Sequence, residues 1–186
     1  MTLLSELLWR RTDEHALEVC RLLRSPDAYV LEGRVLTMAN GHPAEVHYTV
    51  HVGPEWITRA GHVSVVQGAG ERQVIVERDE AGRWRVDGEP RPEFDGIPDI
   101  DLEFTPATNS LPIRRLALPV GESRPSDAVW VRFPGLTCER LQQRYTRLDD
   151  RRYLYETADG AFSAELAVDE HGVVERYGDI WRRVAE

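Results

Sequence analysis

Hydrophobic and polar residues alternate one by one along most of the chain, in short runs separated by turn-forming residues. A period of two is typical of half-buried β-strands, and the runs recur about every ten residues. We expect strands of this kind over residues 29–36, 45–52, 56–66 and 99–104. The spacing favours an all-β sandwich, barrel or roll over alternating strand–helix units.

Three pairs of runs are joined by short, turn-rich segments, which predicts three β-hairpins. The pairs are residues 72–78 with 83–86, residues 143–147 with 152–156, and residues 162–168 with 173–177. Gly61 interrupts the run at 56–66, so we expect either a bulge or the close approach of another element there.

The first 25 residues carry two conflicting patterns. Leu3, Leu4, Leu7 and Leu8 suit one face of a helix, whereas residues 17–22 alternate as a strand does. The pattern alone predicts a helix through Leu8 and leaves the following residues open.

One stretch combines several kinds of signal. Asp99 and Asp101 alternate with apolar residues, a proline then breaks the run, and residues 108–112 read Thr-Asn-Ser-Leu-Pro. A side-chain oxygen just ahead of an early proline is typical of a helix start. Arg114 and Arg115 follow within the predicted helix, which we place at residues 110–118.

The two acids project from one face of a strand, because they lie two residues apart. The favoured interpretation is an internal salt-bridge network, in which Asp99 or Asp101 pairs with Arg114 or Arg115. Adjacent helix residues point about 100° apart, so at most one arginine can face the carboxylates. An arginine-lined anion site and a hydrolase with paired carboxylates are the two alternatives.

Two further groups have both a structural and a functional interpretation. Thr108 and Asn109 suggest an ordinary N-cap, with an anion cradle at the helix start as the alternative. Tyr153 and Tyr155 share one strand face, and together with Tyr145 they either pack in the core or line a groove.

Composition narrows the class of protein. With 186 residues we expect one domain, and the net charge of −9 disfavours nucleic acid and anionic membranes as partners. No run is long enough to span a membrane, and the start of the chain does not resemble a signal peptide. Two cysteines without metal spacing suggest a reducing, cytoplasmic location.

Neither a metal nor a cofactor is expected. His47 and His51 lie about 13 Å apart on a predicted strand, too far to share one metal ion. The chain has no phosphate-binding glycine loop and no Ser-His-Asp order.

Several blocks resemble, in the same order, the bacterial family labelled "putative glycolipid-binding". They are residues 9–11, 31–35, 46–50, 56–59, 82–88, 99–116, 143–147, 165–169 and 172–177. The resemblance implies a spiral β-roll, a many-stranded, mainly antiparallel sheet wrapped around a single short helix, and it places strands in the first 25 residues. It also implies a homodimer, which the edges of an open roll would favour as well. The chain departs from the family pattern at Ala107, where an aromatic is commoner, and at Gly178, where proline is.

We therefore expect one all-β domain over residues 1–186 that binds an amphipathic or anionic small molecule, such as a glycolipid, without catalysis. The alternatives are a dimeric scaffold without a small ligand and a carboxylate-based hydrolase. A site requires the Asp/Arg cluster to open onto a cavity, and an enzyme further requires a carboxyl with a raised pKa at a cleft wall. The candidate ligand-binding residues are Trp56, Arg59, Asp99, Asp101, Thr108, Asn109, Arg114, Arg115, Tyr145, Tyr153 and Tyr155.

Overall fold

The computed structural model describes residues 1–184, which form one sheet of fifteen strands, one α-helix and two short 3-10 helices. The first eight strands are β1 (Thr2–Arg11), β2 (Leu17–Ser25), β3 (Ala28–Ala39), β4 (His42–Val52), β5 (Thr58–Gln67), β6 (Gly70–Arg78), β7 (Trp84–Val86) and β8 (Glu89–Pro90). The others are β9 (Asp99–Leu102), β10 (Ser123–Val131), β11 (Cys138–Arg147), β12 (Arg152–Thr157), β13 (Ser163–Val168), β14 (Val174–Tyr177) and β15 (Trp181–Arg183). The helical segments are η1 (Pro92–Phe94), η2 (Ala107–Asn109) and α1 (Ser110–Leu116).

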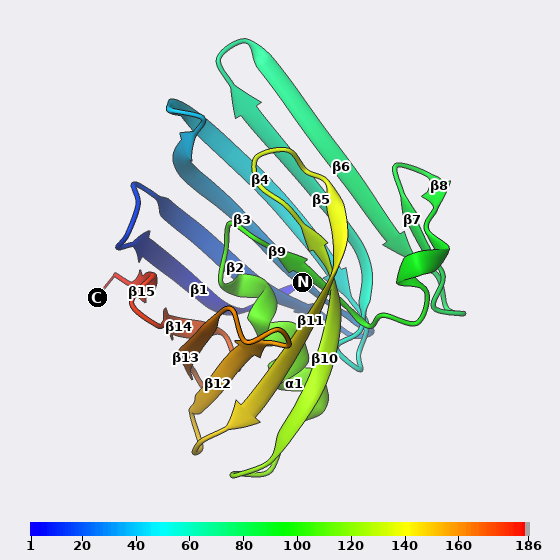
Figure 1. The fold of residues 1–186 in the computed structure, drawn as a ribbon, viewed down its shortest axis with the longest axis vertical. Helices are drawn as coiled ribbons and strands as arrows, with labels where there is room; N and C mark the ends of the chain where they lie inside the picture. The colour runs from blue at the N-terminus through cyan, green and yellow to red at the C-terminus, as the bar shows by residue number, and fades with distance from the viewer. Residues whose placement is uncertain (185–186) are drawn as a thin grey trace.

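The strands follow one another through the sheet in the order β8-β7-β6-β5-β4-β3-β2-β1-β15-β14-β13-β12-β11-β10-β9. β1 pairs with β2 on one side and with β15 on the other, so strands from both ends of the chain meet in the middle of the sheet. Neighbouring strands are antiparallel except β9 and β10, which are parallel. Figure 1 shows the two halves of the sheet facing each other.

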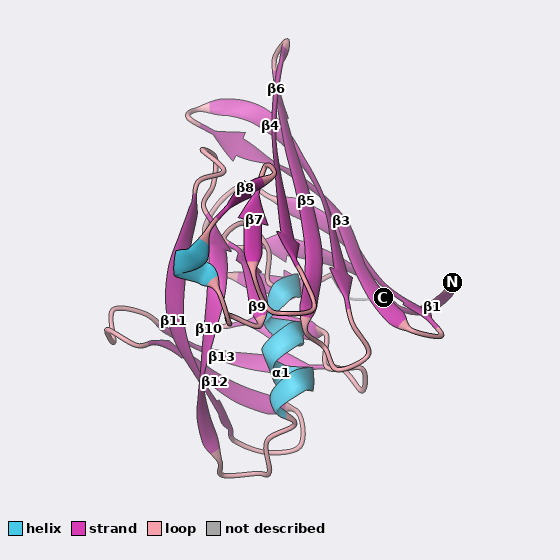
Figure 2. Cartoon of the chain, turned by 90° about the vertical axis from the view of Figure 1, so that its right-hand side faces the viewer, coloured by secondary structure: helices cyan, strands magenta, loops and turns pink. Residues whose placement is uncertain are grey.

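The sheet curls until its last strand, β9, comes back against β5. The Thr58 amide donates to the carbonyl of Pro98 at 3.0 Å, and the Ile100 amide donates to Thr58 Oγ1 at 3.1 Å. A Cβ on Gly61 would lie 2.7 Å from Ile100 Cδ1, so this glycine permits the close approach that the sequence predicts. The result is a spiral roll around α1 (Figure 2), which confirms the predicted fold class.

The strand β9 lies inside the spiral, where Asp99, Ile100 and Leu102 are buried and Asp101 is half-buried. Ile100 and Leu102 belong to a large core cluster together with the inward side chains of β2 to β6. The opposite face of β9 carries Asp99 and Asp101 and lies toward α1 and β11. A smaller cluster fills the roll on that side, with Ile113 of α1 against Tyr145 and Tyr155. The two acids therefore point into the molecule, although the alternating pattern resembles that of a surface strand.

The N-terminal segment is a strand, so the helix that the leucine pattern predicts through Leu8 is wrong. In β1, Leu7 and Trp9 are buried whereas Leu8 and Arg10 are exposed. Pairing with β2 and β15 satisfies the backbone on both sides and overrides the helical spacing. The strands implied by the family resemblance are confirmed here, as are the three predicted hairpins β6–β7, β11–β12 and β13–β14.

The ends of the sheet offer little free backbone to a partner. β8 has two residues, one of them Pro90, and β9 is covered by β5. A longer open edge is residues 71–74 of β6, which carry the charged Glu71 and Arg72. Short ends and charged side chains of this kind disfavour pairing between edge strands.

Candidate functional site

Asp99 is closed into an ion pair at one end of β9. Arg115 donates from Nη2 to Asp99 Oδ2 at 2.6 Å and from Nε to Oδ1 at 3.1 Å. Ser126 of β10 donates to the same carboxylate at 2.9 Å and accepts from Arg115 at 2.7 Å. Burial raises the pKa of Asp99, and the Arg115 guanidinium opposes that rise. The predicted pairing is confirmed, and its polar groups are satisfied within the protein.

Asp101, two residues further along the same face, has no cationic partner among the residues that the structure describes. Gln143 Nε2 of β11 donates to Asp101 Oδ2 at 2.7 Å, and Oδ1 has no hydrogen-bond partner among residues 1–184. Burial raises the pKa of Asp101 to about 6; the Gln143 bond opposes this, whereas the carboxylates of Glu103 and Asp99 add to it. Asp101 is therefore a half-buried carboxylate with one oxygen unused.

Asp101, which carries this unused oxygen, lines a cavity of about 320 Å³ inside the C-terminal half of the roll. The aromatic part of the wall comes from Trp130, Tyr155, Phe162, Tyr177 and Trp181. Tyr155 lies 5.9 Å from Phe162 and 6.0 Å from Tyr177, measured between ring centroids. The other lining residues are Arg11, Leu102, Glu103, Thr105, Pro106, Asn109, Leu141, Thr157 and Ile180.

A hydrogen-bonded chain holds the cavity wall in place. The Tyr145 hydroxyl donates to Asn109 Oδ1 at 2.8 Å and lies 3.5 Å from Gln143 Oε1, so it connects the start of α1 to the amide that holds Asp101. Tyr145 also packs edge to face against Tyr155, with ring centroids 5.4 Å apart. Tyr145 and Asn109 therefore position the site, and Tyr155 lines it.

The predicted N-cap at the start of the helix is wrong. Asn109 has a helical backbone and makes no capping hydrogen bond, because η2 runs directly into α1. Thr108 Oγ1 instead accepts from the Leu102 amide at 3.2 Å, and Asn109 Nδ2 donates to the Pro106 carbonyl at 3.1 Å. These side chains fasten the helix start to β9 and β11. The helix ends at Leu116, two residues earlier than predicted, where Ala117 takes a left-handed conformation with φ 43°.

Arg114 points away from the carboxylates. Its guanidinium lies 5.1 Å from the ring centroid of Trp56, and it lines a second cavity of about 420 Å³ together with Tyr153. Arg59 is exposed, and its Nε is 3.1 Å from the position that a Cβ on Gly53 would take. Arg114, Tyr153, Trp56 and Arg59 therefore do not line the Asp101 cavity.

Sequence reasoning missed part of the Asp101 wall. Phe162, Tyr177 and Trp181 line the cavity from the segment before β13, from β14 and from β15. Tyr177 lies in a block that matches the family, but nothing in the sequence places it near Asp101. That proximity depends on the order in which the strands wind through the sheet.

Sequence reasoning also missed another buried carboxylate, Glu18 on β2. Its Oε1 accepts from the Tyr48 hydroxyl at 2.6 Å and from Thr105 Oγ1 at 2.7 Å, whereas Oε2 has no partner. Burial raises the pKa of Glu18 to about 8, against the effect of those two hydrogen bonds. The available signal was its register, because Glu18 shares a strand face with the apolar Cys20 and Leu22.

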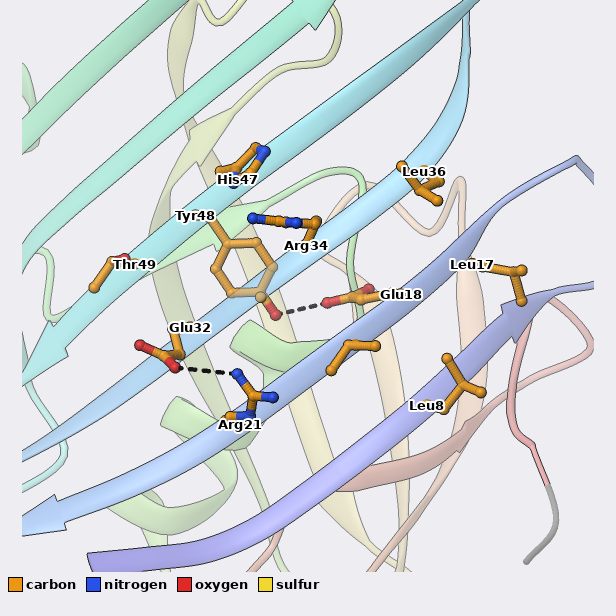
Figure 3. A pocket seen from close by; sticks show the side chains of 12 residues that line it. Leu8, Leu17, Glu18, Arg21, Glu32, Arg34, Leu36, His47, Tyr48 and Thr49 are labelled. Atoms are coloured by element: carbon orange, nitrogen blue, oxygen red, sulfur yellow. Dashed lines mark hydrogen bonds and ion pairs between the residues drawn. The ribbon is translucent and has the colours of Figure 1, made fainter. Parts of the chain in front are cut away.

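The strands β1 to β4 also bound a hollow of about 610 Å³. Figure 3 shows its side chains, including the hydrogen bond between Tyr48 and Glu18. Leu8 and Val19 are direct cross-strand neighbours, as are Leu17 and Leu36, and all four are exposed. None of the candidate ligand-binding residues lines this hollow.

A sheet that spirals around one helix and encloses a cavity with a carboxylate and aromatic walls defines the protein as a spiral β-roll with an internal cavity. Residues 6–183 match the model of the family described as "Putative glycolipid-binding", and the chain belongs to that family.

The fold is similar to the crystal structure of a DUF1089 family protein from Pseudomonas aeruginosa. The two chains are 34% identical, the match covers 91% of this chain and 92% of the other, and the TM-score is 0.80. No curated protein matches the chain significantly. Among residues 1–184, no helix is long and apolar enough to cross a membrane.

Proposed function

We propose that the protein binds an amphipathic small molecule, such as a glycolipid, and that the polar group of this ligand enters the Asp101 cavity. The observation that carries the proposal is the unused Asp101 oxygen on a wall otherwise rich in aromatic rings. Ligand pockets typically combine apolar walls with a few polar groups that orient the ligand. The family description, "Putative glycolipid-binding", supports the same class of ligand.

The size of the cavity limits what enters it. A volume of about 320 Å³ lies at the lower end of the range of about 300–1,000 Å³ for ligand pockets. This suits one polar head group, whereas alkyl chains would extend beyond the cavity. Aromatic faces such as those of Tyr155 and Tyr177 suit the apolar faces of a sugar ring.

An arginine-lined anion site would need an arginine that is free to bind the ligand's head group, and Arg115 is not free to do so. Its Nε and Nη2 donors are used on Asp99 and Ser126. Arg114 forms no ion pair with an acid in residues 1–184, but it lines the second cavity together with Asp150, Asp169 and Glu170. We therefore place the polar group at Asp101 and Tyr155, with Asn109 and Tyr145 as positioning residues.

Native mass spectrometry of the protein purified from its own host tests this function. We expect the wild type to retain a small molecule and Asp101→Asn to lose it while remaining folded. Asp150→Asn is the matched control, because the Asp150 side chain is 96% exposed and does not line the Asp101 cavity. Retention of the same mass by Asp101→Asn, or a wild type without any bound mass, would contradict the proposal.

A carboxylate-based hydrolase is the second candidate, because the pKa of Asp101 is raised to about 6 at a cavity wall. Two-carboxylate hydrolysis also needs a second free carboxyl across the substrate. Glu103 lines the same cavity, but its Oε2 accepts from Arg132 at 3.2 Å and from the Phe133 amide at 2.6 Å. Binding without turnover is thus the better supported function. Release of nitrophenol from nitrophenyl glycosides by the wild type, and not by Asp101→Asn, would reverse this order.

We further propose that the protein forms a homodimer through the exposed apolar residues of β1 to β3. Leu8, Leu17, Val19 and Leu36 form a continuous cross-strand patch on that face. Light scattering after size exclusion should give twice 21.2 kDa. Leu17→Arg should give a monomer, and Ile75→Arg, an exposed apolar position on β6, should leave the dimer intact. A wild type of 21.2 kDa at micromolar concentration would remove this proposal.

Cytoplasmic location remains a proposal as well. Cys20 and Cys138 are buried and free, which supports a reducing compartment. Fractionation of the host cells, followed by immunodetection of the protein, tests this directly.

A further inference from the structure

We infer that the polar group received by the Asp101 cavity carries a primary ammonium, as an amino sugar or another amine-bearing head group does. The inference rests on the proposed function and specifies the class of ligand. Its basis is the charge and the ring arrangement around the unused Asp101 oxygen, which together suit a cation better than a neutral hydroxyl.

Within residues 1–184, no cationic side chain compensates Asp101. Arg115 is engaged with Asp99 and Ser126, and Gln143 supplies only a neutral amide. Arg11 also lines the cavity, but it pairs with Asp13 at 2.8 Å and with Glu14 at 3.1 Å. A half-buried carboxylate without a cation is partly desolvated and uncompensated, so a cationic ligand would gain more here than in a site with its own arginine.

Apart from Arg11, which is paired with Asp13 and Glu14, the other titratable groups around Asp101 are acidic or neutral. Glu103 and Asp99 lie on the same strand and disfavour a second negative charge. Asp101 in turn raises the pKa of three neighbouring phenols, for which burial is the larger cause, so these remain neutral hydroxyls. The phenols belong to Tyr145 of β11, Tyr155 of β12 and Tyr177 of β14. The local field therefore attracts cations and repels anions.

The rings supply a second source of attraction for a cation. Tyr155, Phe162 and Tyr177 lie with centroids 5.9–6.0 Å apart, and Phe162 and Tyr177 are stacked at an interplanar angle of 12°. A cation within about 6 Å of an aromatic face is stabilised by the ring quadrupole, more strongly in a desolvated cavity. A primary ammonium has three donors, so it can bond Asp101 Oδ1 and still contact a ring face.

Calorimetric titration of the full chain with three matched probes tests the inference at pH 7. The probes are octyl 2-amino-2-deoxyglucoside, octyl glucoside and octyl 2-acetamido-2-deoxyglucoside, each below its micelle concentration. They share the sugar and the chain, and only the first carries an ammonium. We expect the amino probe to bind at least tenfold more tightly than either neutral probe. Asp101→Asn should abolish that preference, and the exposed control Asp150→Asn should keep it.

The affinity for the amino probe should also rise about tenfold between pH 5 and pH 7, because the Asp101 carboxyl ionises over this range. The affinity for the neutral probes should change less than threefold. Equal binding of all three probes to the wild type, weakened throughout by Asp101→Asn, would overturn the ammonium inference and leave the proposed function standing. If no probe bound, both would be contradicted.

Discussion

The two acids of β9 differ in what surrounds them, although they lie two residues apart on one strand face. Asp99 is held by Arg115 and Ser126, and its side chain is 1% exposed. Asp101 lines a cavity, and in the described part of the chain its only hydrogen-bond partner is the neutral Gln143 amide. One end of the Asp/Arg block therefore closes the helix against the sheet, and the other end is where we propose that the ligand binds.

The largest expected effect is at the closed end. Arg115→Leu should lower the free energy of unfolding by about 3–5 kcal/mol, because it leaves the buried Asp99 carboxylate without its cation. Arg114→Leu is the matched control one residue away and should cost less than about 1 kcal/mol. Urea denaturation monitored by tryptophan fluorescence measures both values. Equal losses for the two variants would mean that Arg114 is as structural as Arg115.

Glu18 is a fully buried carboxyl with no cationic partner in residues 1–184. Its contribution to the free energy of unfolding should therefore depend on pH. Its pKa is raised from 4.5 to about 8 in the folded state, so the folded chain holds the proton more tightly than the unfolded chain does. Stability contributed by this proton is present below pH 4.5 and is lost as the pH rises to 8, by a few kcal/mol. Glu18→Gln should flatten this slope in urea denaturation across that range. A slope unchanged by the substitution would contradict the buried, protonated state.

The contribution of Asp101 to the free energy of unfolding should change with pH in the same direction as that of Glu18, but by less. Its pKa rises from 3.8 to about 6, so stability falls between those pH values as the carboxyl ionises in the fold. Asp101→Asn should therefore raise the free energy of unfolding at pH 8 by about 1–3 kcal/mol. Asp99→Asn should lower it, because Arg115 would lose its partner. If both substitutions stabilised the protein, or if neither did, the distinction between Asp99 and Asp101 would be removed.

Much of the closed end could be predicted from the sequence. Two acids at strand spacing and two adjacent arginines on a helix predict that one arginine reaches the acids, and Arg115 does so. The same argument could not tell which acid stays unpaired, because that depends on where β9 ends relative to α1. The spacing of the leucines near the start of the chain predicted a helix wrongly for a similar reason. Pairing with β2, which the spacing does not reveal, makes this segment a strand.

The cavity itself could not be predicted, because its wall comes from elements far apart in the chain. Asp101, Tyr155 and Tyr177 meet only because the sheet winds from β9 through β15 in one continuous order. The alternating pattern of β9 indicates a strand with one polar face. Burial of that face follows from the spiral, a property of the whole sheet.

The most direct test of the central contrast is a carbon-13 NMR titration of the aspartate side-chain carboxyls, with and without octyl 2-amino-2-deoxyglucoside. We predict that the Asp101 carboxyl titrates near pH 6 in the free protein. Its midpoint should fall when the probe binds, whereas the Asp99 signal should not respond to the probe. A response at Asp99, or an Asp101 midpoint unmoved by a bound probe, would contradict the assignment of Asp101 as the open site.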